Sequence, residues 1–155
     1  MKELIQVQQL FKSYGNGTKR VEVLKGVDLN FSRGEKAAIV GASGVGKTTL
    51  LHILGTLDRP TTGKVLYEER DIYSLNEKDL ALFRNREIGF VFQFHHLLPE
   101  FSALENTLMP CLIQGIPKME AISRAEAILT LVGLKERLSH KPGELSGGEQ
   151  QRVAV

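Results

Sequence analysis

The sequence predicts an α/β fold with three parts: an antiparallel β subdomain, part of a parallel-sheet core, and a helical subdomain. Apolar and polar residues alternate through much of the first sixty or so positions, which is typical of strands with one buried face. A glycine-rich loop at 41–48 then separates a short apolar run from a segment with helical apolar spacing. Beyond residue 93 the pattern indicates helices, so a helical region follows a mixed sheet.

The strands of the antiparallel part are expected first. Apolar residues at period two indicate strands around 5–7, 21–23 and 27–31. The dipeptide Asn-Gly after the first run and the tripeptide Ser-Arg-Gly after the third predict turns. After a break rich in Pro, Thr and Gly, residues 64–72 are expected to form one more strand. That strand should pair antiparallel, because no crossover connection separates it from its neighbours.

The glycine-rich loop reads GASGVGKT and matches the pattern G-x-x-x-x-G-K-[ST], in which backbone N–H groups surround the phosphates of a nucleotide. The apolar run at 37–40 precedes the loop and predicts a buried strand. The segment behind the loop has helical spacing at Leu50, Leu51, Ile53, Leu54 and Leu57. Strand, loop and helix in this order are the setting that the motif requires. An ordinary glycine turn at a helix start is the alternative interpretation.

The chemistry of the loop follows from its residue types. Its three glycines let the backbone turn tightly and approach phosphate oxygens that a Cβ would obstruct. The helix that begins near Gly46 adds free N–H groups and the positive end of its dipole. Lys47 provides a mobile charge for the β- and γ-phosphates, and the hydroxyl of Thr48 is placed to bind Mg²⁺. The residues expected to contact the nucleotide are Gly41, Ala42, Ser43, Gly44, Val45, Gly46, Lys47, Thr48 and Thr49.

Composition limits the classes of function. A chain of 155 residues with 42% hydrophobic residues can form one sizeable domain. Its 20 basic and 18 acidic residues give a net charge of +2, which provides no global electrostatic case for nucleic acid. The N-terminus does not resemble a signal peptide, and no apolar run is long enough to span a membrane. The single cysteine, Cys111, excludes an internal disulfide and suits a soluble intracellular protein in which it packs as a small apolar side chain.

A strand and then helices are expected in the second half of the chain. The apolar run IGFVFQ at 88–93 predicts a strand that ends in Gln93. The capping-box pattern of Ser102 and Glu105 predicts the start of a helix, which a Gly-Ile-Pro sequence closes. A second helix is expected over 118–132. Its apolar stripe consists of Ile122, Ala125, Leu129 and Val132, with Gly133 as the C-cap.

A second motif occurs at 145–152, where the chain reads LSGGEQQR. Ser-Gly-Gly alone fits a flexible turn, but the residues behind it favour a helix, so the glycines lie at a second helix N-terminus with anion-binding character. With this motif beside the glycine-rich loop, the sequence resembles the ATP-binding cassette (ABC) ATPases, whose signature LSGGQ precedes a helix. Glu149 stands where Gln is commonest in that family, which often accepts this variant. The resemblance covers the whole chain.

The resemblance implies roles for individual residues. The loop at 41–48 corresponds to the Walker A loop of the family. Tyr14 resembles the aromatic residue that stacks on adenine; a packing tyrosine at a strand end is the alternative. Gln93 resembles the glutamine that contacts Mg²⁺ and the attacking water and that senses the transporter. Lys47 and Gln93 are therefore the candidate catalytic residues, and Thr48 and Gln93 the candidate Mg²⁺ ligands.

The signature residues imply how subunits assemble. Ser146, Gly147 and Gly148 resemble the residues that reach the γ-phosphate of a nucleotide held by another subunit. An active site shared in this way implies a head-to-tail homodimer with ATP between its subunits.

A narrower resemblance is to the ATPases of lipoprotein-releasing ABC transporters. It rests on GTLDRPTTGKV at 55–65 and on FQFHHLLPEFSALENTLMP at 92–110, which includes the pair His95-His96. It implies an ATPase that uses ATP and Mg²⁺, acts with two integral membrane permease subunits at the cytoplasmic face of the bacterial inner membrane, and binds no nucleic acid. FtsE-type and macrolide-exporter ATPases are the alternative. The histidines are expected at the surface near the permease contact, because no Cys or Asp ligands accompany them.

The resemblance divides the sequence into three segments of one incomplete domain. These are a nucleotide-binding core with the antiparallel subdomain at 1–92, a Q-loop and helical subdomain at 93–144, and the signature with the start of its helix at 145–155. The Asp-Glu pair (Walker B) and switch histidine that follow the signature in this family have no counterpart in the 155 residues. We therefore expect this stretch alone to hydrolyse ATP negligibly, and to leave apolar surface near 37–57 uncovered and prone to aggregation.

Other classes of protein fit the sequence less well. A P-loop kinase or GTPase shares the loop at 41–48 but not LSGGEQQR, and no guanine-reading Asn-Lys-x-Asp run is present. DNA-repair and chromosome-maintenance relatives place a very long coiled coil between the glutamine and the signature, whereas about fifty residues separate them here. A non-hydrolysing interaction module is a further alternative.

Overall fold

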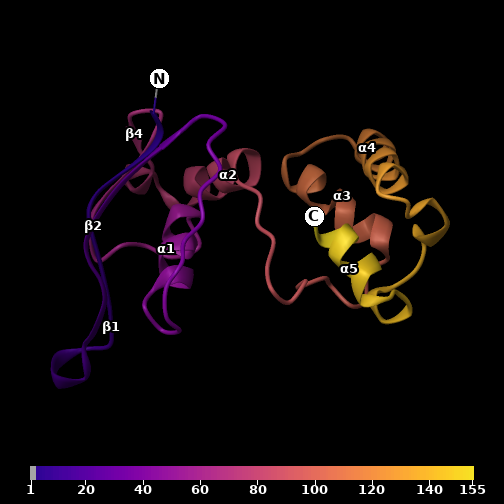
Figure 1. The fold of residues 1–155 in the computed structure, drawn as a ribbon. Helices are drawn as coiled ribbons and strands as arrows, with labels where there is room; N and C mark the ends of the chain where they lie inside the picture. Colours follow the sequence, from indigo (N-terminus) through magenta and orange to yellow (C-terminus); the bar gives the residue numbers. More distant parts are fainter. Residues whose placement is uncertain (1–2) are drawn as a thin grey trace. The chain divides into compact units, whose positions relative to one another are not determined.

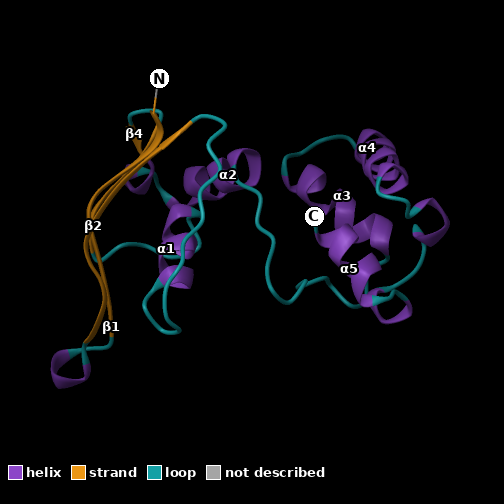
Figure 2. Cartoon of the chain, viewed as in Figure 1, coloured by secondary structure: helices purple, strands orange, loops and turns teal. Residues whose placement is uncertain are grey.

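The structure is a computed structural model that describes residues 3–155, apart from the side chain of residue 18. The chain forms two compact units, Met1–Arg84 and Asn85–Val155. The first unit contains a sheet and two α-helices, and the second consists of helices and loops (Figures 1 and 2). The segment boundaries expected at 92/93 and 144/145 stay predictions.

One four-stranded sheet runs through the first unit, with strand order β2-β1-β3-β4 and antiparallel pairing throughout. Its strands are β1 (Glu3–Tyr14), β2 (Val21–Ser32), β3 (Thr62–Tyr67) and β4 (Arg70–Asp71). A short 3₁₀ turn, η1 (Gly17–Lys19), joins β1 to β2 at the predicted Asn-Gly turn. The antiparallel subdomain predicted from the period-two pattern is therefore confirmed.

An irregularity in β1 decides which of its residues face the core. The pairing register of β1 with β2 shifts between Val7 and Leu10, and Gln9 has a φ of +45°. The backbone N–H of Gln9 donates to the Asp28 carboxylate at 2.7 Å. An extra residue in a strand exchanges the two faces beyond it. Leu10 and Lys12 are therefore buried, although they do not continue the alternation set by Val7.

Two helices, α1 (Lys47–Leu54) and α2 (Glu77–Glu87), pack beside the sheet (Figure 1). The predicted apolar stripe of α1 is buried at Leu50, Ile53 and Leu54. The side chains that pack with them come from the strands, from η2 (Ile72–Ser74) and from α2: Val7, Leu10, Leu24, Val65, Ile72 and Leu80. The sequence pattern did not predict α2, because Leu80 is its one buried residue and a single apolar position makes no stripe.

The single strand predicted over 64–72 is a hairpin in the structure. β3 ends at Tyr67 and β4 begins at Arg70, with Glu68 and Glu69 between them. Both turn residues have positive φ, +47° and +70°, as a two-residue hairpin turn of this handedness requires. The prediction was wrong in extent because Glu-Glu is not a recognisable turn sequence, whereas Asn-Gly is.

The parallel part of the sheet is absent from the described residues. Residues 37–40 and 88–93 are loop rather than strand (Figure 2), so both strand predictions are wrong. A buried parallel strand needs a ladder partner and cover on both faces, and neither segment pairs with a described strand. The expected uncovered apolar surface is confirmed, since Val40, Leu51 and Leu57 are 87%, 48% and 43% exposed.

The second unit is built from α3 (Ala103–Ile113), α4 (Lys118–Leu131) and α5 (Gly147–Ala154), with the 3₁₀ turns η3 (Lys135–Arg137) and η4 (Pro142–Glu144) between the last two. The capping box predicted at Ser102 and Glu105 is present. Helix α4 agrees with the prediction to one residue, and Gly133 lies just beyond it at φ +76°.

The helices of the second unit share two small apolar cores. Residues Ala103, Leu129, Leu134, Leu145 and Val153 form one, and Leu108, Ala121 and Ala125 form the other. Cys111 is half-buried against the second core, as expected of a small apolar side chain. Among the described residues, no helix has the length and apolar character needed to cross a membrane.

Candidate functional site

The glycine-rich loop at 41–46 leads directly into α1. Gly46 is the N-cap of the helix, with a left-handed backbone at φ +101°. A Cβ at this position would lie 3.0 Å from Val23 Cγ1 and 3.1 Å from Leu24 Cδ2. Both the backbone conformation and the close approach to β2 therefore require glycine. Gly44 also has positive φ, +79°, but the space around it is open.

The lysine of the motif folds back over its own loop. The Lys47 Nζ donates to the carbonyl oxygens of Gly41 at 2.9 Å and Ala42 at 2.7 Å. These bonds hold the ammonium group beside the start of α1, where no side chain caps the helix. Residues 41–45 and Thr48 are exposed. The site therefore combines an exposed helix N-terminus with a lysine charge, which is the chemistry that binds phosphate.

Two tyrosine hydroxyls hold the opposite end of α1. Tyr67 donates to the Leu54 carbonyl oxygen at 2.6 Å, and Tyr73 donates to the Ile53 carbonyl oxygen at 2.5 Å. Burial raises the pKa of Tyr67 to about 12 and also raises the pKa of Tyr73. Both hydroxyls thus stay protonated and able to donate at neutral pH. These two bonds hold the C-terminal end of α1 against β3 and η2.

Tyr14 lies at the end of β1 and is tied to neighbouring polar groups. Its hydroxyl donates to Asp58 Oδ2 at 2.7 Å. The side chain of Thr49, in the first turn of α1, lies near enough to lower the pKa of Tyr14 in opposition to burial and Asp58. The Lys12 Nζ lies 4.7 Å from the centroid of its ring. The side chain remains 44% exposed. The structure thus brings the predicted Tyr14 together with Thr49, close to the phosphate loop.

Asp58 is the centre of this group of side chains. Its carboxylate accepts from Lys12 Nζ at 2.6 Å, from Tyr14 and from the Arg59 backbone N–H at 2.8 Å. Although burial works to raise its pKa, the hydrogen bonds from Lys12 and Tyr14 hold the pKa of Asp58 below its ordinary value. Burial, followed by the bond to Asp58, raises the pKa of Tyr14. Sequence analysis missed Lys12 and Asp58 as members of the site, because their contact spans 46 positions and depends on the bulge in β1.

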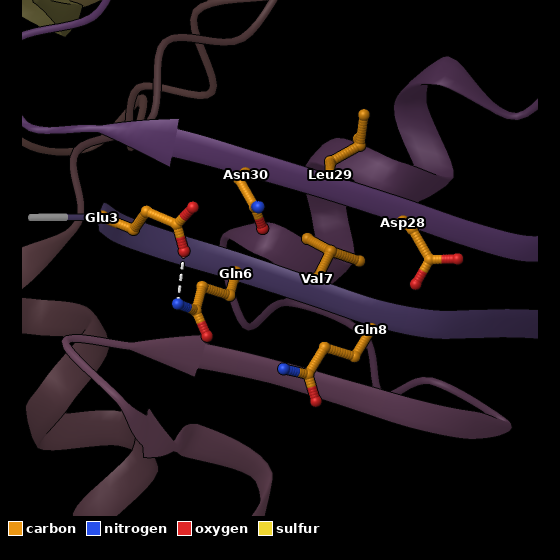
Figure 3. Close-up of a pocket in the computed structure, with 7 residues that line it drawn as sticks. All are labelled: Glu3, Gln6, Val7, Gln8, Asp28, Leu29 and Asn30. Carbon is orange, nitrogen blue, oxygen red and sulfur yellow. Dashed lines mark hydrogen bonds between the residues drawn. The ribbon is translucent and has the colours of Figure 1, made fainter. Parts of the chain in front are cut away.

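Two hollows of similar size lie on the first unit and differ in character. One, of about 420 Å³, adjoins Lys47 and Thr48. Its other lining residues are all apolar: Ile5, Phe31, Ala37, Ile39, Leu51 and Leu54. The other, of about 400 Å³, lies along β1 and β2 (Figure 3). Its lining residues include no lysine or arginine, and its carboxylates already accept hydrogen bonds, Glu3 from Gln6 and Asp28 from Gln9. The first hollow is therefore mainly apolar with one cation at its edge, and the second is mainly polar and has no cation.

Gln93 and its surroundings belong to the second unit. Gln93 is exposed and follows the stacked rings of Phe90 and Phe92, whose centroids lie 5.2 Å apart. His96 is exposed, as predicted, whereas His95 is half-buried and its Nδ1 has no hydrogen-bond partner among the described atoms. The described residues contain no group of three or more His, Cys, Asp or Glu side chains suited to a metal ion. Gln93 and the phosphate loop belong to different units, and the role predicted for Gln93 stays a prediction.

The predicted signature residues open α5, also in the second unit. Ser146 is the N-cap, and its hydroxyl accepts from the Glu149 N–H at 3.3 Å. The Glu149 carboxylate accepts from the Ser146 N–H at 2.7 Å and from Arg137 Nε at 3.2 Å. The bond from the Ser146 backbone, with help from Arg137, lowers the pKa of Glu149. Ser146, Gly147 and Gly148 are exposed, so a ligand can reach them.

Comparison with known proteins agrees with this arrangement. The family model described as ABC transporter matches residues 24–155. The lipoprotein-releasing system ATP-binding protein LolD of Geobacter metallireducens is 59% identical over 100% of this chain and 69% of its own length. LolD of Syntrophus aciditrophicus is 60% identical over 98% of this chain and 68% of its own length.

Solved structures of ATP-binding cassettes also match this chain. An ATP-binding cassette, determined as a dimer in a post-hydrolysis state with ADP and Pi, matches with a TM-score of 0.87 at 38% identity. The match covers 97% of this chain and 67% of that one. A second dimeric structure, of a bacterial ABC transporter cassette, matches with a TM-score of 0.87 at 40% identity and covers 98% and 67%. The predicted ABC ATPase fold is therefore confirmed, although no parallel strand pair occurs among the described residues.

Proposed function

Because the chain belongs to the ABC transporter family, we propose that it is the ATP-binding subunit of a bacterial transporter that releases lipoproteins from the inner membrane. The observation that carries the ATPase part is the exposed start of α1, where Lys47 lies across a glycine-rich loop. The observation that supports the lipoprotein part is the 59–60% identity to two LolD proteins along nearly the whole chain.

In this proposal the phosphates of ATP bind at residues 41–49. Backbone N–H groups at the start of α1 meet the phosphate oxygens, and Lys47 turns from the loop carbonyls toward the β- and γ-phosphates. Tyr14 stacks on the adenine base from the end of β1. This arrangement is supported by the position of Tyr14, whose hydroxyl bonds to Asp58 just beyond α1 and whose pKa is influenced by Thr49 in the first turn of α1.

Mg²⁺ fits the same place. Mg²⁺ takes few protein ligands and completes its shell with phosphate oxygens and water. Thr48 provides an exposed hydroxyl beside Lys47 in the first turn of α1. When bound, Mg²⁺ would neutralise the negative charge that develops on the phosphates. Gln93 is proposed as a further ligand and as the residue that positions the attacking water.

The assembly is proposed as a head-to-tail homodimer. Ser146, Gly147 and Gly148 of one subunit then reach the nucleotide on the other, which their exposure allows. Two integral membrane permeases of the LolC and LolE type complete the transporter, with this subunit on the cytoplasmic face of the inner membrane. The segments 1–92, 93–144 and 145–155 are proposed as the nucleotide-binding core, the helical subdomain and the signature region.

The test uses the intact protein expressed with its membrane partners. Co-purification with two different permeases and ATP-dependent release of a lipoprotein from proteoliposomes are expected. Lys47→Ala should abolish both ATP hydrolysis and release. The matched control is Arg124→Ala, which removes a cation that pairs with Glu120 on the exposed side of α4. Recovery with a single permease of the macrolide-exporter type would contradict the lipoprotein assignment and leave the ATPase assignment standing.

A further inference from the structure

Lys12 occupies an unusual place for a lysine. The bulge at Gln9 turns it to the buried face of β1, and it is only 9% exposed. Its ammonium group donates to Asp58 Oδ1 at 2.6 Å and to the Arg59 carbonyl oxygen at 2.7 Å. A buried charge needs such partners. Lys12 and Asp58 therefore form a fixed polar pair beneath the end of β1.

This pair restrains Tyr14 at two points. Asp58 holds the hydroxyl at 2.7 Å, and the Lys12 ammonium lies 4.7 Å from the ring centroid. Because nearly half of Tyr14 is exposed, these two contacts restrict a side chain that is only partly surrounded by protein. One side of the ring is thus occupied by a cation, while 44% of the side chain stays exposed. This exposure leaves room for another flat ring to approach Tyr14.

We propose that Asp58 and Lys12 are positioning residues that fix the ring of Tyr14 for stacking on a nucleotide base. The inference rests on the proposed function, in which Tyr14 contacts the base of ATP. The restraint lowers the conformational entropy that Tyr14 loses on binding. The Lys12 ammonium also attracts the negative charge on the face of the Tyr14 ring. This reduces the repulsion between that ring and a base stacked on its other face.

The test compares two ligands of the intact protein, Mg²⁺-ATP and inorganic tripolyphosphate. Only ATP has a base, so a variant that disturbs base stacking weakens ATP binding and retains tripolyphosphate binding. Tyr14→Ala should weaken ATP about 10- to 100-fold, the range for loss of one aromatic stack. Tyr14→Phe keeps the ring but removes the hydrogen bond to Asp58, and should weaken ATP about 3- to 10-fold.

Asp58→Asn and Lys12→Met test the pair itself. Each should weaken ATP binding about as much as Tyr14→Phe, and the double variant Tyr14→Phe with Asp58→Asn should be no weaker than the single ones. Glu68→Gln is the matched control, because it removes a carboxylate that pairs with the exposed Arg33 elsewhere in the same unit. It should bind both ligands as the wild type does.

The outcomes separate this inference from the proposed function. If Tyr14→Ala weakens ATP but Tyr14→Phe binds it within twofold of the wild type, the positioning role is overturned and the stacking role stands. If Tyr14→Ala also binds ATP normally, both roles are overturned. If Lys47→Ala retains tripolyphosphate binding, the phosphate site itself is wrong. Tyr14→Phe decides the matter even if Asp58→Asn fails to fold, because it leaves the Lys12–Asp58 pair intact.

Discussion

Two helices of this chain begin beside glycines, and their first turns differ. Helix α1 begins after Gly46, which has left-handed backbone and provides no side-chain cap. Helix α5 begins after Ser146, whose hydroxyl accepts from the Glu149 N–H while the Glu149 carboxylate accepts from the Ser146 N–H. The first N–H groups of any helix have no intrahelical partner. In α5 the chain's own side chains accept from the Ser146 and Glu149 N–H groups, whereas no side chain caps the start of α1.

The difference indicates what each helix start can bind. At α1 no side chain competes with a ligand, and Lys47 adds a positive charge, so several phosphate oxygens can be held by backbone. At α5 the carboxylate of Glu149 already lies at the positive end of the helix. What remains for a ligand is the proton of the Ser146 hydroxyl and the exposed glycines. The start of α1 therefore has more free N–H groups for an anion than the start of α5, which agrees with the proposal that α1 holds the nucleotide and α5 only completes the site.

Of the changes to these two helix starts, removal of the Lys47 charge should have the largest effect on ATP binding. Lys47→Ala should lower the ATP affinity of the intact protein roughly 100-fold, because charged hydrogen bonds to the phosphates are lost. Isothermal titration calorimetry with Mg²⁺-ATP measures this. Arg124→Ala should bind normally. An unchanged affinity of Lys47→Ala would show that the start of α1 is not the phosphate site.

The next largest effect, on stability, is expected when Gly46 is replaced by alanine. Gly46→Ala should reduce the free energy of unfolding by about 2–3 kcal/mol, because it combines left-handed backbone with close contact to β2. Gly44→Ala is the matched control and should cost about 1 kcal/mol, since its surroundings are open. Urea denaturation of the intact protein measures both. Equal losses would mean that the contact with β2 does not constrain the loop.

Ser146 at the start of α5 and Ser102 at the start of α3 cap their helices in the same way, so their substitutions can be compared directly. Ser146→Ala and Ser102→Ala each remove a capping-box hydroxyl and should each cost about 1 kcal/mol of stability. Only Ser146→Ala should also lower ATP hydrolysis, by roughly tenfold, because its hydroxyl is proposed to meet the nucleotide of the partner subunit. Steady-state ATPase rates distinguish the two. Equal ATPase rates in the two variants would show that Ser146 acts only as a helix cap.

The smallest change in stability is expected when the charge of Glu149, in the cap of α5, is removed. The bond from the Ser146 N–H lowers the folded-state pKa of Glu149, so its charge adds stability above its ordinary pKa, and this is lost as the pH falls through the folded value. The stability difference between the wild type and Glu149→Gln should therefore be present at neutral pH, and should decline and be lost as the pH falls below the ordinary pKa of glutamate. Urea midpoints across this range measure it. A difference independent of pH would show that the charge plays no part.

The starts of the helices were predictable because capping is local. Ser102 and Ser146 each bond to a glutamate three positions ahead, and the glycines before Lys47 adopt the positive φ that the loop needs. The antiparallel strands were predictable for a similar reason, since alternation is read within a few residues. Helix α2 was not, because its surface is polar and only Leu80 enters the core.

The sequence by itself therefore determined the phosphate loop, the capped helices, the antiparallel strands and the family. Only the tertiary structure decided that Lys12 is buried, that Asp58 meets Tyr14, that 64–72 is a hairpin and that 37–40 is not a strand. The physical reason is distance along the chain. A bulge changes which residues face the core, and a strand exists only beside a partner, so neither can be read from a short stretch of sequence.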